Sequence, residues 1–97
     1  MYMLDKKVLA TQIYGNDAEE VLAFLAKVAP DKHEFRNEMT FLNFIARKLQ
    51  PMLKKMARND EEKQEFWTNR AISMDITNPI NKKKNVLWCI RLISENL

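Results

Sequence analysis

Apolar residues recur every three or four positions through the middle of the chain, between residues 31 and 58. The members of this stripe are Phe35, Met39, Leu42, Ile45, Ala46, Leu49, Met52, Leu53 and Met56. At about 100° per residue they fall within roughly 140° of one another, which is typical of a helix packed against other elements. Asp31, followed three positions later by Glu34, matches a helix-start signal, so we expect the central helix to begin at Asp31.

Pro51 interrupts this central run. Proline has no amide hydrogen and its ring clashes with the preceding turn, which costs about 3 kcal/mol inside a helix. The stripe nevertheless continues in phase from Leu49 to Leu53. We therefore expect either a kink near Gln50 or two nearly collinear helices, with Pro51 opening the second.

Two shorter helices are predicted before the central one. Leu4, Val8, Leu9 and Ile13 indicate a first helix that ends at Gly15, although the chain up to Leu4 could instead be extended. The second helix is capped by Asn16 or Asp17, buries Val21, Leu22, Phe24, Leu25 and Val28, and ends before Pro30.

Two further helices are predicted after the central one. The first follows Asn59 and Asp60, runs to about Ile76 and buries Phe66, Trp67, Ala71 and Met74. A loop over residues 77–81 separates it from a last helix spanning about Lys83 to Glu95. The last helix places Val86, Cys89, Ile90, Ile93 and Leu97 on one side.

These elements predict an all-α fold, a single small domain over residues 1–97 with four to five helices and a kinked central helix around Pro51. The composition agrees, because 46% of the 97 residues are hydrophobic, 30% are charged and only one is glycine. The net charge of +3 is mild, so it permits nucleic-acid contact without demanding it.

Cations gather on the polar side of the central helix. Arg36, Arg47, Lys54 and Arg58 fall within about 40° of one another, with Lys48 and Lys55 alongside. Such a face is either simply solvated or a docking surface for an acidic partner. Phe44 lies near the centre of this polar side, so we expect it to be exposed, either as an anchor among the cations or as one of the single exposed apolar residues that are common on protein surfaces.

The last helix is apolar nearly all round. Trp88 and Leu92 lie four positions apart on a side away from the main stripe, so that side is either enclosed by other helices or reserved for a partner. Lys82, Lys83 and Lys84 precede them, where their charges oppose the helix dipole. Because this placement is structurally unfavourable, a functional basic patch is one interpretation of the three lysines, beside an ordinary solvated surface.

No pattern for catalysis, a cofactor or a metal site is present. His33 and Cys89 are the single histidine and the single cysteine, whereas a zinc site needs about four such ligands, or three when it is catalytic. One glycine cannot build a glycine-rich phosphate loop. We therefore expect a protein that is not an enzyme and binds no cofactor or metal.

The cellular location follows from similar reasoning. One cysteine allows no internal disulfide, which fits a reducing compartment. Charges at Asp5, Lys6 and Lys7 argue against a signal peptide, and no apolar run approaches the roughly 20 residues needed to span a bilayer. We expect a cytoplasmic protein without a membrane partner.

Taken whole, the chain resembles the small anti-RecBCD proteins of lambdoid phages of enteric bacteria. The resemblance runs from Met1-Tyr2-Met3-Leu4-Asp5-Lys6-Lys7 to Leu92-Ile93-Ser94-Glu95-Asn96-Leu97, and it is carried by size, mild basicity, the single cysteine and the helical layout. It implies a phage protein of the host bacterial cytoplasm that binds the RecBCD helicase-nuclease, through its RecC subunit. Such a protein redirects or inhibits DNA-end processing in favour of phage recombination, with only indirect contact to DNA.

The residues themselves leave three hypotheses. The first is a partner-binding protein that uses Phe44, Arg47, Lys48, Trp88 and Leu92. The second is a non-specific nucleic-acid-binding protein that uses Lys82, Lys83, Lys84, Arg47 and Lys54. The third is a structural protein that self-associates along its last helix.

Overall fold

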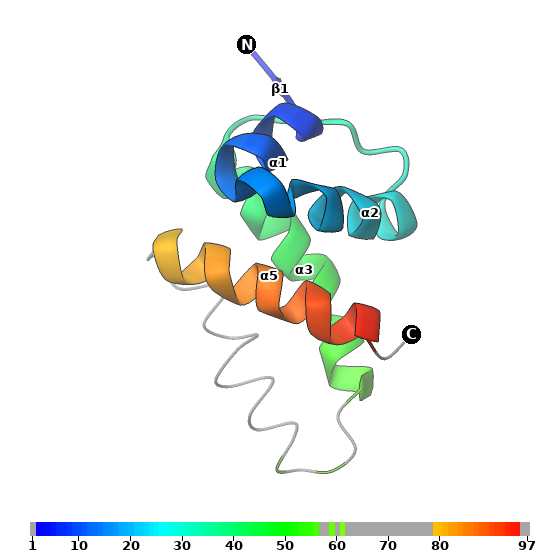
Figure 1. Cartoon of the computed structure of the whole chain (residues 1–97). Coiled ribbons are helices and arrows are strands. Elements are labelled where there is room, and N and C mark those ends of the chain that lie inside the picture. Colours follow the sequence, from blue (N-terminus) through cyan, green and yellow to red (C-terminus); the bar gives the residue numbers. More distant parts are fainter. Residues whose placement is uncertain (1, 57–58, 60, 62–78, 96–97) are drawn as a thin grey trace.

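The computed structural model describes residues 2–56, 59, 61 and 79–95 (Figure 1). Helix accounts for 81% of these residues, so the mostly helical class is confirmed. The helices are α1 (Lys6–Tyr14), α2 (Ala18–Val28), α3 (Glu38–Met56) and α5 (Pro79–Glu95). The predicted count of four to five helices is not shown. Apart from Glu61, the helix predicted over residues 60–76 lies outside the described residues.

The first two helices form a tight pair. Gly15 ends α1 with φ 55° and ψ −118°, and its amide donates to the carbonyl of Thr11. A 3-10 turn, η1 (Gly15–Asp17), then leads directly into α2. The helix end predicted at Gly15 is confirmed, and glycine suits it because residues with a Cβ rarely adopt this backbone conformation.

A small antiparallel sheet, which the sequence did not predict, precedes α3. Strand β1 (Leu4–Asp5) pairs with β2 (Glu34–Phe35), and Leu4 lies opposite Phe35. The extended alternative for the start of the chain is therefore the correct one. The pairing also holds Glu34 and Phe35 in strand conformation, so the helix start predicted at Asp31 is wrong.

The central helix begins at Glu38 instead. Asn37 accepts a hydrogen bond from the Thr40 amide at 2.9 Å through its side-chain oxygen, and its carbonyl accepts one from the Phe41 amide. This is a side-chain cap of the kind that asparagine makes well. Downstream, α3 continues through Pro51 as one helix, so the alternative of two helices is wrong. The kink near Gln50 stays a prediction.

Helix α5 begins at Pro79, four residues before the predicted start. Proline is tolerated in a first helical turn, where its missing amide hydrogen would have no partner within the helix. The predicted inner side is confirmed for the described residues, because Val86, Cys89, Ile90 and Ile93 are all buried.

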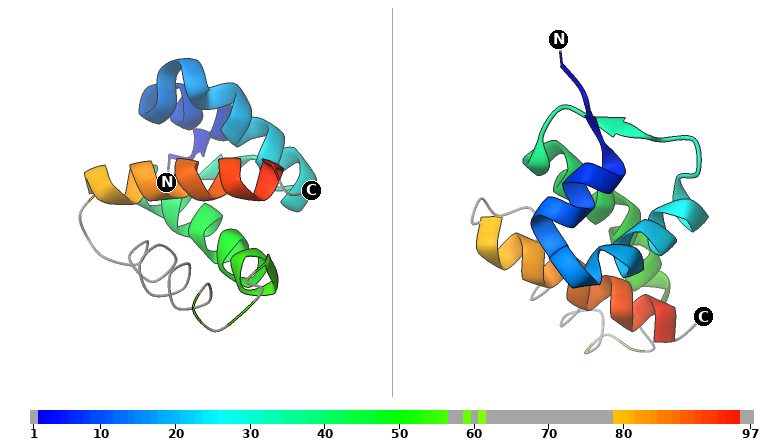
Figure 2. Two further views of the ribbon diagram at one scale, coloured as in Figure 1. Left: turned by 60° about the horizontal axis from the view of Figure 1, so that its bottom comes forward. Right: turned by 45° about the horizontal axis from the view of Figure 1, so that its top comes forward.

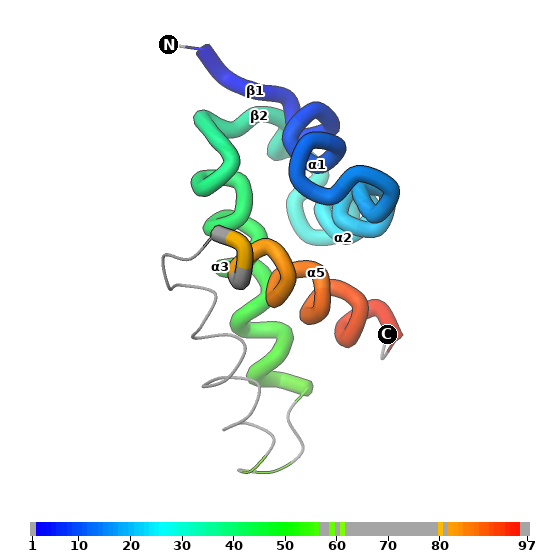
Figure 3. The backbone as a smooth tube through the Cα atoms, turned by 60° about the vertical axis from the view of Figure 1, so that its left-hand side comes forward, coloured from blue at the N-terminus to red at the C-terminus, as the bar shows by residue number. Residues whose placement is uncertain are grey.

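The core forms where α5 crosses α3 beneath the α1–α2 pair (Figures 1 and 2). In the tube view, α5 passes across the middle of α3 while α1 and α2 lie on the other side of α5 (Figure 3). The side chains that α3 buries are Phe41, Leu42, Ile45, Ala46, Leu49 and Leu53. None of the described helices is both long enough and apolar enough to cross a bilayer.

Candidate partner-binding surface

The outer side of α3 carries a set of cations that have no carboxylate partner among the described residues. Between Met39 and Asn59 the chain has five Lys or Arg residues and no Asp or Glu. Four of the five lie in α3 and are exposed, namely Arg47, Lys48, Lys54 and Lys55. We call these four the cationic face of α3. The fifth, Arg58, lies outside the described residues.

The cationic face is a direct consequence of helical phase. Leu49 and Leu53 point into the core with 0% exposure, whereas Arg47, Lys48, Lys54 and Lys55 lie on the opposite side of the helix and are exposed. The face extends over about 12 Å at 1.5 Å per residue. Its four side chains make no ion pair with any residue of the described part of the chain.

Phe44 lies beside this face but is not the exposed anchor that we expected. It is half-buried, and its ring packs at 5.2 Å and 61° against the ring of Phe35, which is buried. The Lys48 ammonium lies 5.4 Å from the centroid of the Phe44 ring, within reach of a cation–π interaction. The Phe44 ring thus contacts the core through Phe35 and the cationic face through Lys48.

The three consecutive lysines do not form one patch. Lys82 is buried, with 2% exposure, and its ammonium donates to the Asn43 side-chain oxygen. Lys83 and Lys84 are exposed. Successive residues of a helix point about 100° apart, which separates the three directions. Lys54 lies on α3, so the structure groups it with Arg47 rather than with these lysines.

Lys83 is held beside Tyr14. The Tyr14 hydroxyl donates to the Lys83 carbonyl at 2.9 Å, and the Lys83 ammonium lies 5.9 Å from the centroid of the Tyr14 ring. Burial raises the pKa of Tyr14 well above its ordinary value of 10, so the phenol keeps its proton and remains a donor.

Trp88 and Leu92 are half-buried and pack against the hydrophobic core. They flank the inner stripe of α5 rather than standing out from it. Both side chains are therefore less exposed than Arg47 and Lys48.

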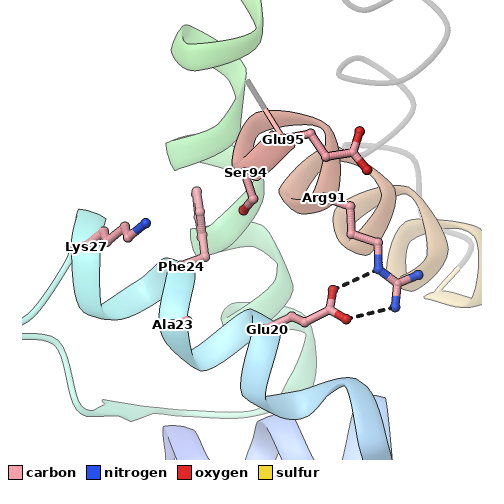
Figure 4. Close-up of a pocket in the computed structure, with 7 residues that line it drawn as sticks. All are labelled: Glu20, Ala23, Phe24, Lys27, Arg91, Ser94 and Glu95. Atoms are coloured by element: carbon pink, nitrogen blue, oxygen red, sulfur yellow. Dashed lines mark hydrogen bonds and ion pairs between the residues drawn. The ribbon is translucent and has the colours of Figure 1, made fainter. Parts of the chain in front are cut away.

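A groove of about 500 Å³ lies between α2 and α5. At one end, Arg91 donates to both Glu20 oxygens, at 2.8 and 3.1 Å (Figure 4). Arg91 also donates to the Asp17 carboxylate at 3.1 Å. The hydrogen bond from Arg91 is the main cause that lowers the pKa of Glu20. Lys27 and Glu95 bring one charge of each sign to the remaining lining. The charges largely compensate one another, so this groove favours no ligand of one sign.

Sequence reasoning missed this ion-pair cluster. Asp17 was predicted as a helix cap, but its side chain makes no capping bond and binds Arg91 instead. Arg91 is 71 positions from Glu20, so no local pattern could have paired them.

A second groove, of about 410 Å³, lies where α1, α3 and α5 meet. Its apolar lining includes Ile13, Met39, Leu42 and Ile80, and Glu38 and Lys83 supply charges of opposite sign. No local pattern in the sequence predicts this groove, because its lining comes from three separate helices.

His33 and Cys89 lie in different environments. His33 is exposed, and its carbonyl accepts a hydrogen bond from the Lys6 amide at 2.9 Å. Cys89 is buried in the core. Within residues 2–56, 59, 61 and 79–95, no three His, Cys, Asp or Glu side chains are close enough to hold a metal ion.

No family model matches the chain, and neither a curated protein nor a solved structure matches it.

Proposed function

We propose that this chain is a protein-binding modulator that docks on an acidic surface of a larger host complex. The cationic face of α3 is the observation that supports this proposal most strongly. Its four cations are exposed, they have no carboxylate partner in the described part of the chain, and the helix that carries them is anchored in the core by Leu49 and Leu53. A helix face with one sign of charge suits the recognition of an acidic surface.

The partner that the resemblance suggests is RecBCD, contacted through its RecC subunit. Under this proposal the protein is made by a phage, acts in the host cytoplasm and performs no chemistry of its own. It occupies part of the complex and thereby redirects or inhibits DNA-end processing, so that phage recombination proceeds. Arg47 and Lys48 supply the first contacts, with the exposed edge of Phe44 beside them.

Nucleic-acid binding is the second candidate, since Arg47 and Lys54 are exposed on one side of α3 and could meet phosphates. The burial of Lys82 weakens this candidate, because it removes one cation from the patch that the sequence predicted. Phosphate contacts also make binding fall steeply with salt, in proportion to the number of cations engaged.

A pull-down from nuclease-treated enterobacterial lysate tests the proposal. The bait is the tagged chain, compared with a variant that carries Arg47→Glu and Lys54→Glu. The matched control carries Lys7→Glu and Lys84→Glu, which change the net charge equally at exposed positions off the cationic face. Mass spectrometry identifies the captured proteins.

We expect RecB, RecC and RecD with the original chain and with the control, and their loss with the α3 variant. Equal capture by all three baits would show that the cationic face does not carry the interaction. Capture that disappears after nuclease treatment, together with salt-sensitive binding to DNA, would replace the proposal by the second candidate.

A further inference from the structure

The cationic face of α3 has a regular layout. Arg47 and Lys54 are seven residues apart, and so are Lys48 and Lys55. Seven residues make almost two full helical turns, so each pair forms a row along the helix that is about 10.5 Å long. The two rows lie about 100° apart around the helix axis. The face therefore consists of two parallel rows of positive charge.

An uncharged line runs between the two rows. Phe44 and Pro51 are also seven residues apart, and helical phase places both midway between the rows, with Phe44 at the N-terminal end. Pro51 is exposed and has no amide hydrogen, and Phe44 is half-buried. The line lies opposite Leu49 and Leu53, which are buried, so it faces away from the core. A partner can approach this line closely without removing water from a polar side chain.

The length of the rows indicates which kind of partner element fits. Carboxylates that meet both ends of a row must be about 10.5 Å apart on one side of their own element. In an α-helix, residues seven positions apart satisfy this condition. In a β-strand, side chains on one face repeat about every 6.7 Å, and the second repeat comes at about 13.4 Å. A helix therefore matches the rows better than a strand does.

Charge complementarity determines the sign of that helix. No Asp or Glu occurs between Met39 and Asn59, and no ion pair among the described residues engages the four cations. Nucleic acid is also negative, but neither Phe44 nor Pro51 can donate a side-chain hydrogen bond to a phosphate from the line between the rows. An acidic protein helix suits this layout better, because protein interfaces commonly combine an apolar centre with a polar rim.

We infer that the partner of this face is an acidic α-helix, which lies along α3 and carries two rows of carboxylates with the same seven-residue repeat. One row binds Arg47 and Lys54, and the other binds Lys48 and Lys55. The uncharged line contacts the strip between the carboxylate rows. This inference rests on the proposed function and deepens it, because it names the secondary structure and the charge pattern of the acidic surface.

Two synthetic peptides test the inference without RecBCD. Both are helices of about 22 residues rich in alanine and glutamine, long enough to be helical alone, and both carry four glutamates. In the paired peptide, two adjacent glutamates are followed by two more seven residues later. In the distributed peptide, the glutamates are five residues apart, which spreads them around the helix. Circular dichroism checks that helicity is equal, and fluorescence polarisation at low ionic strength measures the binding of each labelled peptide to the full chain.

We expect the paired peptide to bind about tenfold more tightly than the distributed one. It can meet all four cations at once, whereas the distributed peptide meets about two, and each exposed ion pair changes the affinity by up to about fivefold. Removing one row with Arg47→Gln and Lys54→Gln should lower the affinity of the paired peptide to about that of the distributed one. The matched control, Lys7→Gln with Lys84→Gln, changes the net charge equally at exposed positions and should keep the preference.

Equal affinities of the two peptides, or a preference that survives the loss of the Arg47 and Lys54 row, would overturn the inference. Capture of RecBCD that depends on the cationic face would still support the proposed function in that case. A preference for the paired peptide, together with failed capture of RecBCD, would keep the recognition of an acidic helix and reject the named partner. A DNA duplex that displaces the paired peptide at a lower concentration of negative charge would assign the face to nucleic acid and overturn the inference.

Discussion

Truncation of Phe44 distinguishes a structural side chain from an exposed binding anchor. The Phe44 ring is half-buried and meets the Phe35 ring at 5.2 Å, and the Phe35 ring in turn meets the Phe41 ring at 5.0 Å. Phe35 and Phe41 have 1% and 0% exposure, so Phe44 covers the outer end of a buried aromatic cluster. Its removal should therefore destabilise the fold.

The magnitude follows from burial. Truncating a fully buried phenylalanine to alanine costs about 3–5 kcal/mol, and a half-buried ring should lose about half of that. We expect Phe44→Ala to lower the free energy of unfolding by about 2 kcal/mol. In a domain of this size, that corresponds to a fall in Tm of roughly 8–16 °C.

Urea denaturation followed by far-ultraviolet circular dichroism measures this change. Phe44→Leu is the matched control, because it keeps much of the apolar volume, and it should cost about 1 kcal/mol. A loss below about 0.5 kcal/mol for Phe44→Ala would refute the reasoning. It would mean that the ring contributes little to the core and would restore its interpretation as an exposed anchor.

Three further variants test local features of the fold. Asn37→Ala removes the cap of α3 and should cost about 1 kcal/mol in urea denaturation, whereas Asn37→Asp should stay close to the original stability. Gly15→Ala should cost about 2 kcal/mol by the same assay, because the φ of 55° is strained for a residue with a Cβ. An added Cβ would meet no atom within 4 Å, so a steric clash cannot be the cause, and an unchanged stability would show that the φ of 55° is not required. Arg91→Gln should lower Tm slightly at neutral pH, and the difference should vanish in acid. The pKa of Glu20 is lowered from 4.5 in the folded state, so its pairing contributes fully above pH 4.5 and is lost as pH falls through the lowered value; a difference that persists in strong acid would contradict the role of Glu20.

The buried side of the central helix was predictable because its apolar residues recur with a single helical period. Leu42, Ile45, Ala46, Leu49 and Leu53 all belong to the predicted stripe, and all are buried. Amphipathic spacing over this length leaves only one side that can face a core. Phe41 is also fully buried, although its phase puts it at the edge of that stripe.

The beginning of this helix was not predictable from local signals. Asp31 and Glu34 have the spacing of a capping pair, but Glu34 and Phe35 pair with β1, which lies about thirty residues earlier in the chain. Long-range pairing determines the conformation there, and Asn37 becomes the cap. The same pairing brings Phe35 against Phe44, which is why the helical phase of Phe44 alone predicted exposure wrongly.

Lys82 illustrates a signal that was present in the sequence. It lies four positions before Val86 and seven before Cys89, both buried, so it shares the inner stripe of α5 once the helix starts at Pro79. The predicted helix start near Lys83 left Lys82 outside the helix, so its position on the inner stripe was not recognised. The Arg91 cluster and both grooves depend on how separate helices pack, and periodicity within one helix does not report that.

Binding to purified RecBCD, measured by isothermal titration calorimetry, tests the central claim most directly. The original chain is compared with the Arg47→Glu, Lys54→Glu variant and with the Lys7→Glu, Lys84→Glu control. We expect the α3 variant to bind at least about tenfold more weakly, because two attractions become repulsions, while the control stays within about twofold. Equal affinities for all three, or no binding by the original chain, would contradict the account.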